Sequence, residues 1–215
     1  TLHKHGACVG IQLNHAGASA YAYRLNGEMP LSSSSTPSKK NGNIPRPMTH
    51  DEIYHAVDKF GDAAERVRRA GFDCVEIHAG HSYLISQFLS PLFNKRTDEF
   101  GGSVENRARI LTLIVDKVRA CVGPRFPVSL RISADDFLEG GNTLEDSLRI
   151  LELCEEKVDI INVSAAQNDN LNFQIDQMSL EDGWKRYLSR AVRDKFHKPT
   201  VIAGNIRTPK VAEDI

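Results

Sequence analysis

The sequence predicts an α/β fold of parallel strand–helix units, because continuous apolar runs alternate with helix-like segments along all 215 residues. Runs without polar alternation are typical of parallel strands covered on both faces, and the later runs recur at ~30–40-residue spacing, as in βαβ units. A doubly wound sheet and a β/α barrel both fit this pattern, although a complete barrel has eight strands. The apolar runs cover 7–13, 72–78, 127–133, 159–164 and 200–204.

The segments between these runs carry helix signals. Thr49-His50-Asp51-Glu52 has the form of a capping box. Behind it, apolar residues recur at helical spacing up to Gly71, a residue suited to a helix end. Thr143 is expected to cap another helix. The predicted helices span 49–71, 103–123, 143–157 and 184–197, and one more begins at Thr208-Pro209.

Two long loops are expected within a single domain. The segment 18–47 is rich in Ser, Pro, Asn and Gly, and loops of this length in compact domains are usually functional. The polar segment 165–183 follows the fourth run and is expected to shape a pocket on the active-site side. The length of the chain suits one domain with a sizeable core.

Charge, hydropathy and cysteine spacing exclude several classes of protein. The formal net charge of −1 gives no electrostatic reason to expect nucleic acid or an anionic membrane as a partner. No apolar run approaches the ~20 residues that cross a bilayer. The four cysteines are widely spaced and form no Cys-x-x-Cys pair, and three lie in apolar periodic segments. This favours buried free thiols and a reducing, cytoplasmic location.

The strongest chemical signal lies at the end of the second run, where His78, His81 and Tyr83 follow Val75-Glu76-Ile77. In a β/α barrel, the carboxyl ends of the strands carry the chemistry. Two imidazoles can donate hydrogen bonds to one oxygen, and a phenol held nearby can deliver a proton to carbon. These residues suit the polarisation of a carbonyl or nitro group and protonation of the adjacent carbon.

Two other interpretations of the histidines remain open at this stage. His78 and His81 have the spacing of a chelating pair, and Asp135 or Asp136 could complete a metal site in a metal-dependent hydrolase. Alternatively, both histidines are hydrogen-bonded core residues without a chemical role.

Four more residues are candidates for cofactor contacts. Gln12 lies near the end of the first run, where its amide suits a ring edge with adjacent C=O and N–H groups, or else a structural hydrogen bond. Arg131 lies in an apolar run and needs an anion, either on a cofactor or on a carboxylate such as Glu76 or Asp135. Gly204-Asn205 follows the last run, where backbone N–H groups can cradle a phosphate.

These motifs resemble those of the Old Yellow Enzyme family of flavin oxidoreductases, in particular the branch similar to 2,4-dienoyl-CoA reductases and NADH:flavin oxidoreductases. The matching segments keep the family's order and cover nearly the whole chain, and the stretch from His78 to Arg107 is the most specific. The segments are Ile11–Gly17, Ala70–Asp73, Val75–Leu84, Gln87–Pro91, Asn94–Ser103 and Glu105–Arg107.

The resemblance implies a partial TIM (β/α)8 barrel of about five βα units that binds FMN and uses NADH or NADPH as reductant. It implies that Gln12 contacts the pyrimidine edge of the flavin and that Arg131 lies near flavin N1 and the C2 oxygen. Gly204 and Asn205 would supply part of the phosphate site.

The resemblance also assigns the residues at the end of the second run. In an ene-reductase of this family, His78 and His81 would bind the oxygen of a small α,β-unsaturated carbonyl or nitro substrate, and Tyr83 would be the proton donor. No resident metal is implied for these side chains.

The chain departs from the family pattern at Ser82, where a glycine is common. By resemblance, the first two barrel strands precede Thr1, and the last strand with its Gly-Arg phosphate loop lies beyond Ile215. Residues 1–215 would then be a single, incomplete β/α-barrel domain. Some members carry a cysteine-bound iron–sulfur cluster and a dinucleotide-binding region, which would belong to a longer parent and not to this chain.

A second hypothesis belongs to another class of protein. An unclosed barrel leaves strand edges with unpaired N–H and C=O groups, which are templates for association. The chain could therefore be a catalytically inactive fragment that self-associates edge to edge as a homo-oligomer. Binding of FMN would favour the enzyme hypothesis.

Overall fold

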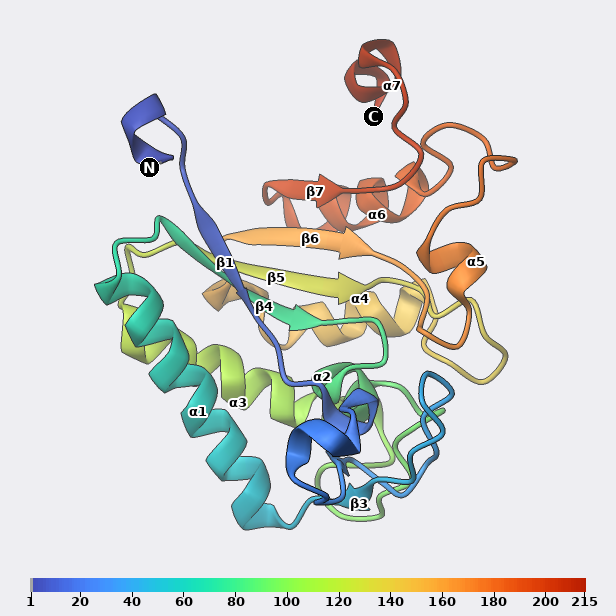
Figure 1. Cartoon of the computed structure of the whole chain (residues 1–215). Helices are drawn as coiled ribbons and strands as arrows, with labels where there is room; N and C mark the ends of the chain where they lie inside the picture. Colours follow the sequence, from blue (N-terminus) through green and yellow to red (C-terminus); the bar gives the residue numbers. More distant parts are fainter. Residues whose placement is uncertain (1) are drawn as a thin grey trace.

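A five-stranded parallel sheet forms the centre of the molecule (Figure 1). The computed structural model describes residues 2–215. Strand order follows chain order, and every neighbouring pair is parallel. A doubly wound sheet reverses its order at a switch point, so the uninterrupted order is that of a barrel wall. In sheet order, the strands are β1 (Gly10–Leu13), β4 (Cys74–Ala79), β5 (Val128–Ser133), β6 (Ile160–Ser164) and β7 (Thr200–Ile202).

Helices α1 and α3 lie side by side against one face of the sheet (Figure 1). The predicted capping box of α1 is confirmed, because the Thr49 side chain accepts a hydrogen bond from the Glu52 N–H while the Glu52 carboxylate accepts one from the Thr49 N–H. Thr143 caps α4 in the same way, through Asp146. The helices are α1 (His50–Arg69), α2 (Leu84–Leu89), α3 (Val104–Val122), α4 (Leu144–Glu152), α5 (Leu171–Gln174), α6 (Arg186–Phe196) and α7 (Pro209–Asp214).

The two faces of the sheet differ in chemistry because side chains alternate along each strand. Val75, Ile77, Leu130 and Ile161 point to the helix-covered face and are fully buried there. The opposite face is polar. A single carboxylate, that of Glu76, joins four strands on it, because it accepts hydrogen bonds from Gln12 at 2.6 Å, Ser129 at 2.8 Å and Asn162 at 2.9 Å.

The loop 18–47 is attached to the sheet through Gln87 of α2. The Gln87 Oε1 atom accepts hydrogen bonds from Ala18 N at 3.0 Å and Ser32 Oγ at 2.8 Å, and the Gln87 carbonyl accepts one from Ser33 Oγ at 2.7 Å. The loop therefore has a fixed path beside the end of β4. The remaining short elements are the 3-10 turns η1 (His3–His5), η2 (Gly17–Ser19), η3 (Ala22–Leu25) and η4 (Glu155–Lys157), and the paired strands β2 (Leu31–Ser32) and β3 (Arg46–Pro47).

Several boundaries predicted from the sequence are wrong. The helix expected over 143–157 ends at Glu152, and a separate 3-10 turn follows it. The last strand is shorter than 200–204. The short helix α2 was not predicted, because it is stabilised by complete burial against α3 and the sheet rather than by a long periodic pattern. Helix α5 interrupts the loop expected over 165–183.

β1 and β7 are the edge strands, each paired on one side only within residues 2–215. All four cysteines are free thiols, as expected, but the expected burial is wrong for Cys8, Cys74 and Cys121, and only Cys154 is buried. In the described part of the chain, no helix has both the length and the apolar character needed to cross a membrane.

We expect Thr49→Ala to lower the free energy of unfolding by about 1 kcal/mol, because the N-terminus of α1 loses its side-chain acceptor. Urea denaturation measures this change. Thr49→Ser keeps the hydroxyl and is the matched control, with an expected change near zero. Equal losses in both variants would show that the cap contributes nothing.

Candidate functional site

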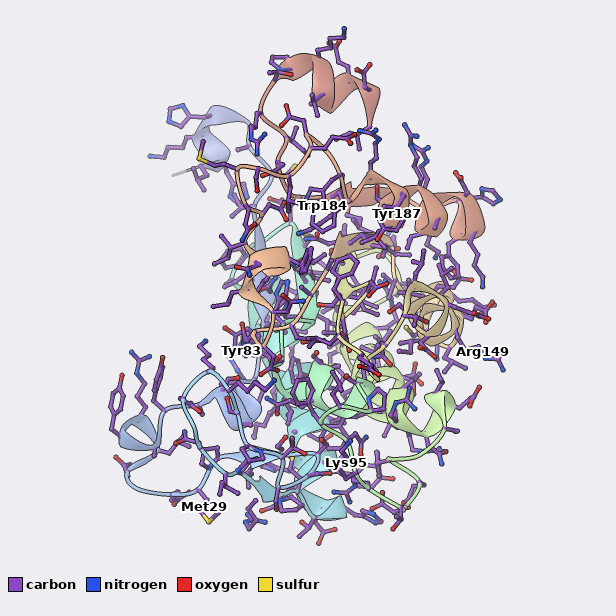
Figure 2. The ribbon with its side chains drawn as sticks, turned by 90° about the vertical axis from the view of Figure 1, so that its right-hand side faces the viewer. Met29, Tyr83, Lys95, Arg149, Trp184 and Tyr187 are labelled. Carbon is purple, nitrogen blue, oxygen red and sulfur yellow. The ribbon has the colours of Figure 1, made fainter. Side chains whose placement is uncertain are left out.

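His78, His81 and Tyr83 lie together at the carboxyl end of β4. The ring centroid of His78 lies 5.0 Å from that of His81 and 5.4 Å from that of Tyr83. Figure 2 looks onto this end of the sheet and shows Tyr83 between the light-blue 18–47 loop and the orange segment of α5. The structure therefore brings the three predicted side chains into one cluster.

Burial keeps both histidines neutral at pH 7. Desolvation, aided by the nearby Arg131 cation, lowers the pKa of His78 to about 4. Desolvation, aided first by His78, lowers the pKa of His81 to about 3. A neutral imidazole offers one donor and one acceptor nitrogen.

The two histidines differ in their free hydrogen-bonding capacity. His81 Nδ1 lies 3.3 Å from His78 Nε2, and His81 Nε2 lies 2.7 Å from Ser164 Oγ, so both nitrogens of His81 are engaged. His78 Nδ1 is buried and has no partner within residues 2–215. In this arrangement, His78 Nδ1 is the imidazole nitrogen of the pair that has no partner and keeps its hydrogen-bonding capacity.

The turn at His81 and Ser82, which sets the direction of the cluster's side chains, has a strained backbone. His81 and Ser82 have φ values of +58° and +55°, a left-handed conformation that side chains with a Cβ rarely adopt. The His81 N–H donates to Ser133 Oγ at 3.2 Å, and the Ser82 carbonyl accepts hydrogen bonds from Ser19 Oγ at 3.0 Å and Gln87 Nε2 at 2.6 Å. A strained backbone of this kind persists only where many surrounding contacts hold it in place.

Gln167, from the loop after β6, completes the support of this turn. Its Oε1 atom accepts hydrogen bonds from the Ser82 N–H and, at 3.0 Å, from Ser82 Oγ and Ser86 Oγ. Its Nε2 atom donates to Asp136 at 2.5 Å. Asp136 is buried and also accepts from Ser90 Oγ at 2.7 Å, and burial raises the pKa of this carboxyl. Gln167 therefore links the loops that follow β4, β5 and β6.

Arg131 lies beside His78 in the sheet, and the two residues are partners in the β4–β5 register. Arg131 Nε is buried without a hydrogen-bond partner, and among residues 2–215 the arginine forms no ion pair with Glu76 or Asp135. The sequence-based alternative that Arg131 pairs with Glu76 or Asp135 is therefore wrong. Buried polar atoms without partners are rare and call for a ligand or ordered water, so two such nitrogens on neighbouring register partners fit a polar ligand.

Gln12 is on the same polar face, but its amide N–H₂ donates to Glu76. Its predicted flavin contact would therefore have to use the amide hydrogen-bonding groups that Glu76 does not occupy.

The groups predicted to hold a phosphate lie after β7. Gly204 has a φ of +125° and lies directly against the Asp176 carboxylate, while Asn205 Nδ2 donates to the carbonyls of Gln177 at 3.0 Å and Leu180 at 3.2 Å. The segment 176–180 thus occupies the groups predicted to hold a phosphate, and their role stays a prediction.

Sequence reasoning missed three polar residues near the cluster. Lys40 Nζ lies 3.3 Å from the Tyr83 hydroxyl and 5.2 Å from the centre of its ring. Gln167 supports the turn, and Lys185 is buried beside Asp176. All three lie in or next to the predicted loops, where no local sequence pattern marks them. The burial of Lys185 is the feature that distinguishes it, and burial within a loop is not visible in the sequence.

The structure gives little support to a metal at the two histidines. Within residues 2–215, the one group of three potential ligands within reach of each other is His50, Asp98 and Glu99, and it contains neither His78 nor His81.

A cavity of about 700 Å³ lies between the end of β1, Met48 and α1, and none of the predicted site residues lines it.

Residues 1–215 match the sequence profile of the NADH:flavin oxidoreductase / NADH oxidase family over their whole length. The chain belongs to this family. The NADH oxidase of Thermoanaerobacter brockii is 38% identical over 215 residues, which are 100% of this chain and 33% of that protein. The NADPH dehydrogenase of Clostridium acetobutylicum is 35% identical, over 99% of this chain and 60% of its own length. The resemblance seen in the sequence is thus confirmed.

Solved structures of this flavin oxidoreductase class share the fold. A 2-naphthoyl-CoA reductase in complex with 2-naphthoyl-CoA has a TM-score of 0.91 and 30% identity, and the match covers 99% of this chain and 34% of that one. The old yellow enzyme homologue from Zymomonas mobilis has a TM-score of 0.80 and 26% identity, over 99% and 61%. The chain spans about a third to three-fifths of the length of the relatives it matches, which agrees with a partial barrel.

We expect Gln167→Leu to lower the free energy of unfolding by roughly 2–3 kcal/mol, because the Ser82 N–H and Asp136 both lose a buried partner. Gln174→Leu, in the short helix α5, is the matched control and should change stability little. Chemical denaturation of both variants measures the difference. A loss below about 0.5 kcal/mol for Gln167→Leu would contradict the assigned support.

The histidine pKa values also predict a pH dependence of stability. An unfolded histidine titrates near ~6.5, whereas the folded His78 and His81 titrate near 4 and 3. The unfolded state therefore binds more protons below about pH 6.5, and stability must fall as the pH is lowered toward 4. Denaturation at pH 7 and 4.5 should show a smaller loss for His78→Asn than for the parent chain, by roughly 2–3 kcal/mol. Parallel pH profiles would refute the neutral, buried state.

Proposed function

We propose that this chain is the substrate-binding part of an FMN-dependent oxidoreductase that reduces the activated C=C bond of α,β-unsaturated carbonyl compounds with NADH or NADPH. The observation that carries the proposal is the pair of buried, unpartnered nitrogens, His78 Nδ1 and Arg131 Nε, on register partners, with the Tyr83 ring 5.4 Å from that of His78. Family membership supports the flavin and the nicotinamide reductant.

FMN, when bound, would supply the hydride, and the protein would position and tune it. Arg131 would face the flavin with a permanent positive charge, which favours negative charge on the reduced ring. Gln12 would present its amide to the ring edge while Glu76 holds it in place. Gly204 and Asn205 would contribute at the phosphate end once the segment 176–180 withdraws.

His78 and His81 would bind the carbonyl oxygen of the substrate. A neutral His78 donates one hydrogen bond from Nδ1, and this bond strengthens as negative charge develops on the oxygen. In this tautomer the one N–H of neutral His81 is on Nδ1 and donates to His78 Nε2, so His81 would join the substrate oxygen only with its proton on Nε2 and its bonds to both His78 and Ser164 given up. Tyr83 would then transfer its hydroxyl proton to the α-carbon, with Lys40 beside the phenol oxygen.

The substrate class rests on this donor set. A carbonyl or nitro oxygen accepts from imidazole, and conjugation carries its polarisation to the β-carbon. The solved complex of a 2-naphthoyl-CoA reductase with 2-naphthoyl-CoA supports the proposal, because that ligand is a conjugated acyl thioester.

The alternative of an inactive, self-associating fragment has one observation in its favour, the free outer edges of β1 and β7. Sedimentation velocity of the purified chain, together with its absorbance spectrum, separates the two hypotheses. A protein that gains FMN-like absorbance on titration with FMN supports the enzyme hypothesis. A colourless oligomer that gains none supports the alternative.

We expect Tyr83→Phe to slow reoxidation of the reduced, FMN-loaded protein by an enone at least tenfold, because the proton donor is lost. Reduction by the nicotinamide should be nearly unchanged. Stopped-flow absorbance measures the two half-reactions separately. Tyr23→Phe, on an exposed tyrosine of the 18–47 loop, is the control. Equal losses in both half-reactions would disprove the proton-donor role of Tyr83.

A further inference from the structure

Lys40 extends from the 18–47 loop to the hydroxyl of Tyr83. Its ammonium nitrogen lies 3.3 Å from the Tyr83 oxygen and 5.2 Å from the centre of the Tyr83 ring. A lysine ammonium carries three donors and no acceptor. The Tyr83 oxygen is therefore the acceptor in this contact, and the hydroxyl hydrogen must point away from Lys40.

This contact fixes one side of the phenol and leaves its hydrogen available. Within residues 2–215, the Tyr83 hydroxyl has no hydrogen-bond partner besides Lys40. A phenolic hydroxyl has one donor as well as its acceptor capacity. The donor therefore remains free for a reacting atom, and the ammonium restricts the directions in which it can point.

The loop holds the backbone of Lys40 in a turn. The Ser38 N–H donates to the Asn43 carbonyl at 2.9 Å and closes the turn around the lysine. The side chains of Asn41 and Asn43 both donate to the Ala20 carbonyl, at 3.0 Å and 2.7 Å. The segment that carries Lys40 is thus tied to the start of the loop, beside the end of β4.

The charge of Lys40 is not balanced by a carboxylate. In the described part of the chain, no acidic side chain lies within ion-pair distance of its ammonium. The nearby His78 and His81 are neutral at pH 7. Asp169, on the loop after β6, is attracted by the neighbouring Lys39. The Lys40 ammonium therefore remains free to stabilise negative charge on the phenol oxygen.

We propose that Lys40 is a positioning residue for proton transfer, which orients the Tyr83 hydroxyl toward the substrate and returns a proton to the phenol oxygen afterwards. The proposal rests on the proposed function, in which Tyr83 is the proton donor.

The proton balance of this step is closed. The O–H bond of Tyr83 breaks as the C–H bond forms at the α-carbon of the substrate, and the electron pair of the O–H bond stays on the phenol oxygen. The Lys40 ammonium stabilises that phenolate and then gives it one of its own protons. Lys40 is exposed, so water can return a proton to the amine, and each reduction consumes one proton from solvent.

Stopped-flow absorbance of the FMN-loaded protein tests this role. Lys40→Met should slow reoxidation of the reduced protein by an enone about tenfold and leave reduction by the nicotinamide within about twofold. Lys40→Arg keeps a cation and should restore reoxidation to within about threefold of the parent rate. Lys39→Met, on the adjacent exposed lysine, is the matched control and should behave as the parent.

A double-mutant cycle separates this role from a structural one. If Lys40 acts through the phenol, Lys40→Met should slow reoxidation by less than about twofold in a Tyr83→Phe background. A residue that only stabilises the loop would slow both half-reactions, or would add its full effect to that of Tyr83→Phe. Either of these results would overturn the proposal.

The contact itself has a readout that needs no activity. Nuclear Overhauser contacts between the Lys40 methylene protons and the Tyr83 ring protons should be present in the purified chain. Their absence, or a Lys40→Met variant as fast as the parent while Tyr83→Phe is slow, would overturn the role of Lys40 alone. If no enone reoxidises the reduced parent protein, the proposed function fails, and the role of Lys40 fails with it.

Discussion

The side-chain amide of Gln167 holds together the end of the sheet on which the candidate site is built. It accepts from the Ser82 backbone and hydroxyl and donates to Asp136, so it joins the loops after three consecutive strands. The turn that it supports has two successive left-handed residues. Each such residue costs of order 1–3 kcal/mol, and a dense hydrogen-bond network is the usual way in which a fold offsets that cost. The direction of His81 and Tyr83 follows from this turn.

The second determinant of the site is the contrast between the two faces of the sheet. Alternation along parallel strands sends apolar side chains into the helix layer and polar ones to the opposite face. On that polar face, Glu76 ties four strands together, while His78 and Arg131 keep nitrogens without partners. Fold stability therefore comes mainly from one face and ligand chemistry from the other, and the binding groups can remain unsatisfied without loss of the core.

Much of the fold was predictable because its determinants are local. Continuous apolar runs predicted the five strands, and the Thr49 capping box predicted the start of α1. The cluster of His78, His81 and Tyr83 was also predictable, because all three side chains lie within one short segment at a strand end.

The remaining features of the site could not be predicted from local sequence patterns. Gln167 acts across loops, because its partners Ser82, Ser86 and Asp136 are 85, 81 and 31 residues away along the chain. Lys185 pairs with Asp176 within one loop that has no periodic pattern. The short helix α2 is too brief for periodicity and exists because its side chains fill the core. Ser82 was visible as a departure from glycine, but its stabilisation by Gln167 depends on long-range contacts. The engagement of His81 with Ser164 likewise required coordinates.

In the proposed function, the unpartnered Nδ1 atom of His78 binds a ligand oxygen in the FMN-loaded protein. Titration of the FMN-loaded protein with a phenol, followed by the flavin absorbance spectrum, tests it most directly. We expect a ligand-induced spectral change whose dissociation constant rises at least tenfold in His78→Ala and stays the same in His55→Ala, an exposed histidine of α1. Identical titrations of the parent protein and His78→Ala would contradict this role of His78.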